Sequence, residues 1–332
     1  MAVTLADVAA RAGVSTTTAS RVLARSRAVS PGVQAAVERA SSELGYAGNG
    51  VARALRRQRT DAVGMVVPSI RNPFFTALVD AVERTLQTTG RVLYLCDARD
   101  DVTVEAQHLR SLVARGVDGI VVSPCADGRS TAAVVEAAAR VPLVQLDRHV
   151  PEPVADWVGL DDRAAMDLVV DRLAARGVRA AGFVTAAVAN SSTRERAAGF
   201  ADACARVGIR TDPAWTVTGA FTIADGIAAG QRFVELGAGR PDAVVCADDL
   251  LAIGVSHALR GAGLDIPADV AVTGLDDLEF APYVSPPLTT VRQPTDRMAE
   301  EVLRLLDRPP GATRTPGTRI ALPPTLVVRA SA

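Results

Sequence analysis

The chain has 332 residues, of which 48% are hydrophobic, 22% charged and 4% aromatic, so its composition is globular and its length allows two or three domains. No stretch approaches the roughly eighteen consecutive apolar residues of a membrane span, and the N-terminus has helical periodicity with an acid at Asp7 instead of an export signal. With a net charge of −1, we expect a cytoplasmic protein that does not contact a membrane.

The charge is unevenly distributed along the chain. Residues 1–60 carry nine arginines and three acidic residues, a net charge of +6, and the rest carries 27 arginines and 34 acidic residues, a net charge of −7. A basic segment on an acidic body is typical of a module that binds a polyanion, although a solvated basic surface has the same composition. The four cysteines stand singly near apolar runs, which favours buried free thiols over disulfides or a metal site.

Two helices fit the first 25 residues. Thr4 precedes the apolar positions of the first helix, Asp7 completes a weak capping box, and Gly13 ends the helix. Ser15 is a good N-cap for a second helix that runs to about Arg25.

A third helix is expected to begin at Ser30-Pro31 and to end at Gly45. The AGV turn between the first two helices, with the small Ala9 four residues before Gly13, leaves room for the tight corner of a helix-turn-helix module.

The second helix is expected to present a polar face to DNA. Its apolar residues pack inward, so Thr17 and Arg21, one turn apart, point outward together with Thr16. In a helix-turn-helix module the second helix enters the major groove with its N-terminus first. The alternative is a small helical bundle with a solvated polar surface. The spacing, the caps and the charge together favour DNA binding.

After residue 60 the pattern changes to short buried strands that alternate with helices. Two series of strands are visible: AVGMVVP, RVLYLC, GIVVSP and VPLVQL, then AAGFVTA, WTVTG, DAVVCA and DVAVTGL. The first helices between them are expected to begin near Pro73, Val102 and Ser130. This α/β pattern predicts two Rossmann-like lobes with parallel sheets and a ligand cleft at the carboxyl ends of the strands. Because no phosphate-binding glycine motif follows these strands, we expect no nucleotide cofactor.

These segments resemble the LacI/GalR (lactose-repressor) family of transcriptional regulators. The resemblance rests on TLADVAARAGVSTTTASRVL, VSPGVQAAVERASSELGY, VARALR, NPFF, QLDR, RERAAGF, CADDLLAIG, VTGLDD and PPLTTVRQP, in this order. It covers essentially the whole chain.

The resemblance implies three parts: a helix-turn-helix DNA-binding domain, a hinge segment, and a body of the periplasmic-binding-protein type that binds an effector and dimerises. The implied ranges are 1–46, 47–60 and 61–332. The body would divide into a first lobe of about 61–160 plus 293–320 and a second lobe of about 161–292 plus 321–332.

In this family the recognition helix reads bases, and the matching residues here are Thr16, Thr17 and Arg21. Threonine offers a hydroxyl and a methyl group to base edges, and arginine can donate two hydrogen bonds to a guanine. Other residues orient the module through phosphate or DNA-backbone contacts without specifying sequence. These are Thr4, Ser15, Thr18 and Tyr46.

The hinge segment NGVARALRRQRT is implied to fold into a short helix on DNA, where Leu55 wedges into a minor-groove step. The other expected contacts of this segment are Asn49, Ala52, Arg53, Arg56 and Arg57. A merely basic linker is the alternative. Gly48 stands where the family commonly has proline, and Gly50 begins the hinge, so we expect a hinge that is less ordered without DNA.

An effector cleft is implied by side chains that follow strands or begin helices. Phe74, Phe75 and Phe221 offer flat apolar surfaces to a sugar or a base. The polar residues implied are Asn72, Asp147, Arg148, Arg196, Asp248, Asp276 and Gln293. Singly, each is more often an ordinary strand-end cap or a surface charge. Without Asp248 and Phe221, the set looks like a ribose-type pocket. Asp248 departs from the family, which usually has asparagine there, so ribose is only the first expectation.

We expect a nucleoid-associated homodimeric repressor that leaves a palindromic operator of carbohydrate uptake or catabolic genes when a small sugar binds. A purine-type regulator with a nucleobase or nucleoside corepressor is the alternative within the family. A sugar-binding receptor would share the lobes but not the basic head. An enzyme would need a nucleophile with a base, a metal set or a cofactor loop, and the three histidines form no such pattern. The sequence ends without a leucine-heptad tail, which favours a dimer over a tetramer.

Overall fold

The structure is a computed structural model that describes residues 3–23, 29–46, 59–308 and 317–332. The chain forms two compact units, residues 1–60 and residues 61–332, and each is considered by itself. Six of the residues expected to contact DNA lie outside the described residues, namely Asn49, Ala52, Arg53, Leu55, Arg56 and Arg57. None of the helices in the described ranges is long and apolar enough to cross a membrane.

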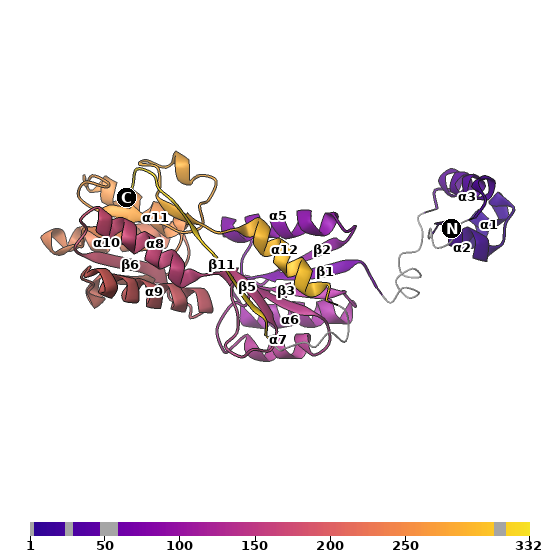
Figure 1. Cartoon of the computed structure of the whole chain (residues 1–332), viewed down its shortest axis with the longest axis horizontal. Coiled ribbons are helices and arrows are strands. Elements are labelled where there is room, and N and C mark those ends of the chain that lie inside the picture. Colours follow the sequence, from indigo (N-terminus) through magenta and orange to yellow (C-terminus); the bar gives the residue numbers. More distant parts are fainter. Residues whose placement is uncertain (1–2, 24–28, 47–58, 309–316) are drawn as a thin grey trace. The chain divides into compact units, whose positions relative to one another are not determined.

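The N-terminal unit contains the three helices that the sequence predicts (Figure 1). They are α1 (Leu5–Ala12), α2 (Thr16–Leu23) and α3 (Pro31–Leu44). Their apolar faces enclose a small core of valine and alanine side chains, among them Val8, Ala19 and Val37. Ser30 occupies the N-cap position of α3 but makes no side-chain capping hydrogen bond, so proline at the first helical position determines this helix start.

The first lobe of the body is a six-stranded parallel sheet with helices on both faces. The strand order is β11-β5-β4-β3-β1-β2. Its strands are β1 (Ala62–Val67), β2 (Val92–Asp97), β3 (Gly119–Val122), β4 (Leu143–Leu146), β5 (Asp156–Leu160) and β11 (Arg319–Leu322). Its helices are α5 (Pro73–Gln87), α6 (Val102–Ala114), α7 (Thr131–Ala138) and α12 (Thr295–Leu306). Figure 1 shows α5 and α12 on one face of this sheet and α6 and α7 on the other.

The second lobe is built on a four-stranded parallel sheet with the order β7-β6-β8-β9. Its strands are β6 (Ala181–Ala186), β7 (Thr216–Gly219), β8 (Ala243–Cys246) and β9 (Ala271–Thr273). Its helices are α8 (Asp162–Ala175), α9 (Ser191–Val207), α10 (Ile223–Glu235) and α11 (Asp249–Gly261). Two short antiparallel strands, β10 (Thr290–Arg292) and β12 (Thr325–Val327), pair beside α8.

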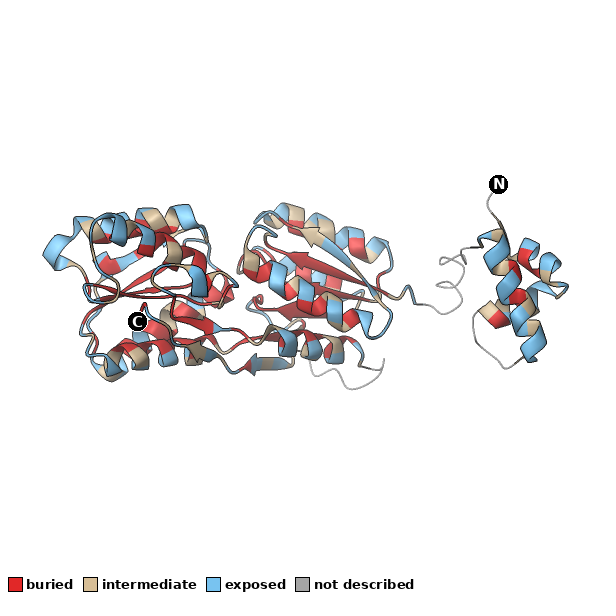
Figure 2. Ribbon diagram, turned by 90° about the horizontal axis from the view of Figure 1, so that it is seen from above, coloured by how far each residue is buried: buried red, intermediate tan, exposed pale blue. Residues whose placement is uncertain are grey.

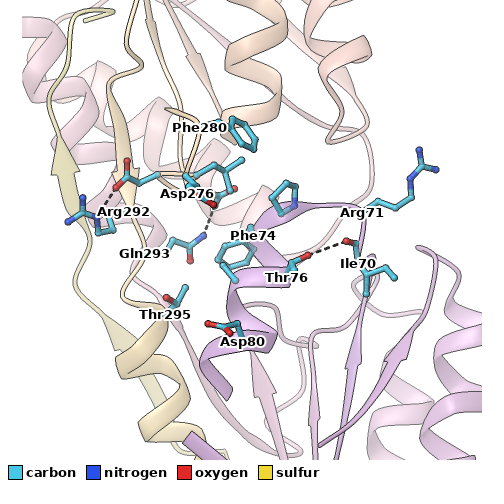
Figure 3. A pocket seen from close by; sticks show the side chains of 15 residues that line it. Ile70, Arg71, Phe74, Thr76, Asp80, Asp276, Phe280, Arg292, Gln293 and Thr295 are labelled. Atoms are coloured by element: carbon cyan, nitrogen blue, oxygen red, sulfur yellow. Dashed lines mark hydrogen bonds and ion pairs between the residues drawn. The ribbon is translucent and has the colours of Figure 1, made fainter. Parts of the chain in front are cut away.

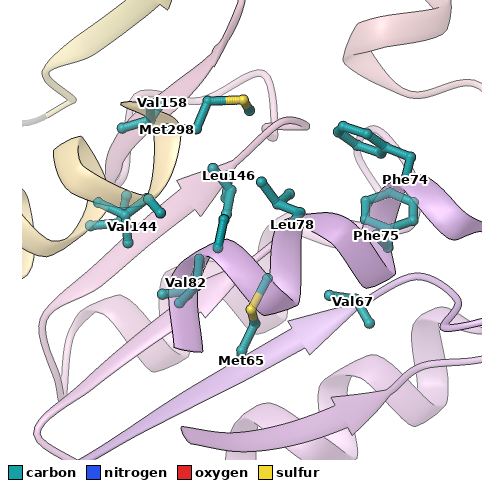
Figure 4. Packing of buried hydrophobic residues seen from close by; sticks show 14 of the residues in the cluster. Met65, Val67, Phe74, Phe75, Leu78, Val82, Val144, Leu146, Val158 and Met298 are labelled. Carbon is teal, nitrogen blue, oxygen red and sulfur yellow. The ribbon is translucent and has the colours of Figure 1, made fainter. Parts of the chain in front are cut away.

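The inner strands of both sheets are buried and the helices expose their outer faces, as Figure 2 shows. The edge strand β2 is the exception, because no strand within the described residues pairs with its outer edge, and the prediction of RVLYLC as a buried strand is wrong in this respect. In the first lobe, β1 reads AVGMVV and all six of its residues are buried, which is why the strand is apolar without alternation. Met65 and Leu78 belong to the core between this sheet, α5 and α12, into which Met298 of α12 also packs (Figure 4). Phe74 and Phe75 lie at the end of this core that adjoins the cleft.

Each strand of the two predicted series is present, and α5, α6 and α7 begin at or beside the expected positions. The short strands β5, β10, β11 and β12 were not predicted. β11 pairs with β5 and so belongs to the first lobe. It runs to Leu322, two residues past the lobe boundary expected at residue 320. Its place depends on a partner more than 150 residues away in sequence, as the pairing of Arg319 with Trp157 shows. Local pattern contains no information about such a pairing.

Candidate functional site

α1 and α2 meet in a tight corner that hydrogen bonds fix at the helix ends. Thr4 Oγ1 accepts from Asp7 N at 3.3 Å, and the Asp7 carboxylate accepts from Thr4 N at 2.8 Å, which completes the capping box. Gly13 ends α1 with a φ of 66°, a left-handed conformation that glycine adopts without strain. The expected helix-turn-helix corner is therefore well determined by local interactions.

The exposed face of α2 carries three of the predicted DNA-reading residues. Thr16, Thr17 and Arg21 are exposed. Ser15 Oγ accepts from Thr18 N at 3.1 Å and lies 2.9 Å from Thr18 Oγ1. Because Thr18 is half-buried and bonded to the cap, its hydroxyl stabilises the start of the helix in this structure.

The remaining described residues of this surface lie at the edges of the unit. Thr4 is exposed at the start of α1, and Tyr46 is half-buried against the helical core just after α3. Tyr46 N donates to Ser41 O at 2.9 Å, which holds the chain close to the end of α3. An ion pair of 2.7 Å between Arg11 and Glu43 links α1 to α3 on the surface.

In the body, the first lobe contributes aromatic rings to the cleft from the start of α5. Asn72 Oδ1 accepts from Phe74 N at 3.0 Å and so caps this helix. The rings of Phe74 and Phe75 stand edge to face with centroids 5.2 Å apart, and both side chains are buried. The cap thus fixes where the two rings enter the cleft.

Asp147 and Arg148 follow β4 at the same edge of the sheet. The Arg148 guanidinium lies over the Phe75 ring at 5.2 Å and over the Phe221 ring of the second lobe at 6.0 Å, so one cation joins the two lobes. Asp147 Oδ2 lies 3.8 Å from Arg148 Nε. Asp147 has a φ of 64°, a conformation that costs a non-glycine residue about 1–3 kcal/mol and is common at functional sites.

Arg196 of α9 is the buried cation of the second lobe. Its Nε donates to Asp162 Oδ1 at 2.7 Å and its Nη1 donates to Ala247 O at 2.8 Å. These bonds tie α9 to the start of α8 and to the end of β8. Burial alone would lower the pKa of Arg196, but the carboxylates of Asp162, Asp276 and Asp147 raise it above its usual value.

Two further carboxylates reach the cleft from the second lobe. Asp248 Oδ1 accepts from Leu251 N at 2.8 Å and caps α11. Asp276, which follows β9 with a φ of 122°, accepts at Oδ1 from Gln293 Nε2 at 2.8 Å (Figure 3). Within the described part of the chain, three buried cleft atoms have no hydrogen-bond partner: Ser192 Oγ, Asp248 Oδ2 and Gln293 Oε1.

Burial dominates the titration of the cleft carboxyls. It raises the pKa of Asp162 to about 6 and that of Asp248 to about 7, against the opposing effect of Arg196. Burial also raises the pKa of Asp147 and, by a large amount, that of Asp276, where the neighbouring Asp248 carboxylate adds to the effect. The cleft therefore holds acidic groups that are costly to ionise without a partner.

Two adjoining cavities make up the cleft. The inner cavity, about 20 Å³, is lined by Asn72, Phe74, Phe75, Asp147, Arg148, Ser192, Arg196, Phe221, Asp248 and Asp276. Nine of these are predicted effector residues. The one other predicted effector residue, Gln293, lines a wider mouth of about 560 Å³. This mouth shares Phe74 and Asp276 with the inner cavity (Figure 3). The inner cavity, as it stands, has room for about one water molecule.

Sequence reasoning missed Asp162 and Ser192. Asp162 begins a helix after the unpredicted β5, and the only signal for Ser192 was its place in the first turn of α9. Asp249, the first residue of α11, accepts from Thr290 Oγ1 at 2.6 Å and from Leu278 N at 2.8 Å. It therefore holds the chain after β9 against α11.

Two family models match the chain. Bacterial regulatory proteins of the lacI family match residues 4–49, and a periplasmic binding protein-like domain matches residues 170–332. The ribose operon repressor of Escherichia coli (strain K12) is 32% identical over 329 residues, 99% of each chain. The HTH-type transcriptional repressor PurR of Photobacterium profundum is 31% identical over 304 residues, 91% of this chain and 90% of that one.

Solved structures agree with these matches. The Lac repressor dimer bound to operator and the anti-inducer ONPF has a TM-score of 0.88 at 27% identity, over 100% of this chain and 99% of that one. The complex of the transcriptional regulator CelR with cellobiose has a TM-score of 0.74 at 32% identity, over 99% of this chain and 100% of that one. Both the helical head and the two-lobed body are thus similar to known regulators.

Proposed function

The chain belongs to the lacI family of bacterial regulatory proteins, which are DNA-binding transcription repressors and not enzymes, and we propose that a small sugar in the cleft releases this repressor from a palindromic operator. One observation carries the proposal. Aromatic rings, guanidiniums and carboxylates from both lobes converge on one cavity. Such a set suits the apolar face of a sugar ring and dense hydrogen bonding to its hydroxyls.

A ribose-like sugar is the first candidate for the effector. A relative that is 32% identical over nearly its whole length is a ribose operon repressor. Carboxylates accept from vicinal hydroxyls, and Arg148 and Arg196 donate to them. The second candidate is a nucleobase or nucleoside corepressor, because a relative at 31% identity is PurR and the rings of Phe75 and Phe221 also suit the face of a base.

In the proposed mechanism the effector acts by shifting a population of lobe arrangements. The inner cavity admits only about one water molecule, so a sugar that enters it requires the lobes to move apart and then to close around it. The proposed hinge, residues 47–60, transmits that change to the helical head, residues 1–46. The effector can weaken operator binding by no more than the difference between its binding free energies for the two arrangements, the one that binds DNA and the one that does not.

On DNA, we assign base reading to Thr16, Thr17 and Arg21, which share the exposed face of α2. A palindromic operator requires two heads, so the working form is a homodimer. Support for this comes from the edge strand β2, where Val92, Tyr94 and Leu95 are 52%, 48% and 44% exposed. Apolar residues grouped on an unpaired sheet edge are typical of an interface.

The test combines operator selection with effector titration. An operator is selected from random palindromes, and its dissociation constant is measured by fluorescence anisotropy with sugars, nucleobases and nucleosides added one at a time. Weaker binding with a sugar supports induction, whereas tighter binding with a base supports the purine-type alternative. If no compound of either class changes the dissociation constant, the proposed effector classes are wrong.

A further inference from the structure

The charges in the cleft do not pair evenly. The Arg196 guanidinium bonds to Asp162 at 2.7 Å, and Arg148 Nε lies 3.8 Å from Asp147. Each guanidinium thus has one carboxylate within 4 Å, although Arg196 also interacts with Asp276 and Asp147 at longer range. Within the described ranges, no ion pair reaches the remaining cleft carboxylates, Asp248 and Asp276.

Asp248 is the first of these two carboxyls, and it is buried in the inner cavity. Its residue is 2% exposed, and Oδ1 is occupied by the bond from Leu251 N. Oδ2 faces no donor in the part of the chain that the structure describes. Burial outweighs the N-terminus of α11 and the nearby guanidiniums, so without a ligand this carboxyl is only partly ionised near pH 7. A ligand cation favours the ionised form, which only accepts, so the ligand atom that meets Oδ2 is then an N–H or O–H donor.

Asp276 is the second of the two cleft carboxyls without an ion pair in the described ranges. One of its oxygens accepts from Gln293, and the residue lines both the inner cavity and the mouth (Figure 3). The carboxylates of Asp248 and Asp276 interact strongly enough that Asp248 raises the pKa of Asp276. Two carboxyls in one desolvated cavity do not both ionise readily, and a ligand that brings a positive charge favours the ionised form of each.

A separate observation points to a ligand with further donors. Ser192 Oγ is buried, lines the same cavity and has no partner within the described residues, and the same is true of Gln293 Oε1 at the mouth. The rings of Phe74, Phe75 and Phe221 cover the cavity with apolar surface. Hydroxyls suit the unpartnered oxygens and C–H groups suit the rings, so an organic cation fits better than a bare metal ion.

We propose that the effector is an amino- or iminosugar whose protonated nitrogen donates to Asp248 and Asp276. This rests on the proposed sugar-class effector and narrows it. Neutral sugars have hydroxyls for the same oxygens but supply no charge that would favour ionisation of the two buried carboxyls. The usual family residue at this position, asparagine, is neutral, so the preference for a cation is specific to the aspartate.

The experiment compares matched ligands by isothermal titration calorimetry at pH 7 on the full chain. The first pair is anhydro-D-ribitol and the iminoribitol in which a protonated ring nitrogen replaces the ring oxygen. The second pair is D-glucose and D-glucosamine. We expect an amine to bind at least about tenfold more tightly than its neutral partner, as a charge-assisted hydrogen bond in a buried site allows.

Asp248→Asn tests the residue itself, since asparagine also caps a helix and the fold is retained. Its preference for the amine should shrink to within about threefold, and Asp276→Asn should weaken the same preference. Glu235→Gln removes an equal charge from the exposed end of α10 in the same lobe and should keep the wild-type preference. Thermal unfolding of each ligand-free variant confirms that it is folded.

The possible outcomes separate this inference from the proposed function. If neutral sugars bind as tightly as the amines and still weaken operator binding, the sugar effector stands and the amine is wrong. If Asp248→Asn keeps the full preference, Asp248 is not the recognising group and the inference fails. If neither member of either pair binds, both this inference and the sugar-class effector are overturned.

Discussion

Replacing Asp248 by asparagine should stabilise the ligand-free body. The side chain is 2% exposed, and burial raises its pKa from 3.8 to about 7. A shift of roughly three units, at about 1.4 kcal/mol for each, corresponds to about 4 kcal/mol of lost stability when the carboxyl is ionised. Asparagine keeps part of the burial cost and loses the favourable interaction of an anion with the start of α11, so we expect a gain of about 2–4 kcal/mol at pH 8.

The pH dependence gives this prediction its sign. Because the folded-state pKa of Asp248 is raised, the protonated carboxyl adds stability below about pH 4, and this contribution is lost as pH rises through about 7. The asparagine variant does not titrate there. The difference between the two proteins should therefore be large at pH 8 and small at pH 5. Arg196 and Arg148 act on the same carboxyl at both pH values.

The assay is thermal unfolding of the ligand-free protein at pH 5 and pH 8. For a body of this size, about 2–4 kcal/mol corresponds to a rise of roughly 4–10 °C in Tm at pH 8. Glu235→Gln, exposed on α10, should leave Tm unchanged at both values. Equal or lower Tm for Asp248→Asn at pH 8, or a gain that is the same at pH 5, would refute the reasoning that an undercompensated charge is buried here.

Three other changes test separate parts of the molecule. Thr17→Ala should cost about 1–3 kcal/mol of discrimination at one operator position, seen by comparing dissociation constants for single-base variants, and equal weakening on every sequence would contradict base reading. Arg196→Met should lower the free energy of unfolding in urea by about 3–5 kcal/mol, because Asp162 is left buried and unpaired. Arg206→Met, on the exposed face of the same helix, should cost no more than about 1 kcal/mol. Gly254→Ala would place a Cβ 2.3 Å from a carbonyl oxygen of α10 and should destabilise the protein by about 1–3 kcal/mol. Gly261→Ala, whose Cβ would lie in open space, should be neutral or stabilising. Equal effects of the two substitutions on the free energy of unfolding would refute the close packing of α10 on α11.

Much of the fold follows from local sequence. Runs such as AVGMVV are apolar throughout because both faces of a parallel strand are covered, and the helices between them begin at proline or at capping side chains such as Asn72 and Asp101. The helices of the head could be predicted in the same way. Thr4 and Ser15 cap helices through hydrogen bonds to residues three positions on, and Gly13 ends α1. The strands β5, β10, β11 and β12 escaped prediction because each is short and depends on a distant partner.

The candidate site, too, could be predicted from the sequence only in part. Because parallel strands end at one edge of a sheet, the sequence by itself placed residues such as Asp147, Asp248 and Asp276 at a common cleft. Only the tertiary structure decided which charges are paired. Arg196 pairs with Asp162 of α8, and Thr290 and Leu278 bond to Asp249, whereas Asp248 and Asp276 have no ion pair within 4 Å in the described part of the chain. Such pairing depends on distances of 2.6–2.8 Å between side chains far apart in sequence, which spacing along a chain does not determine.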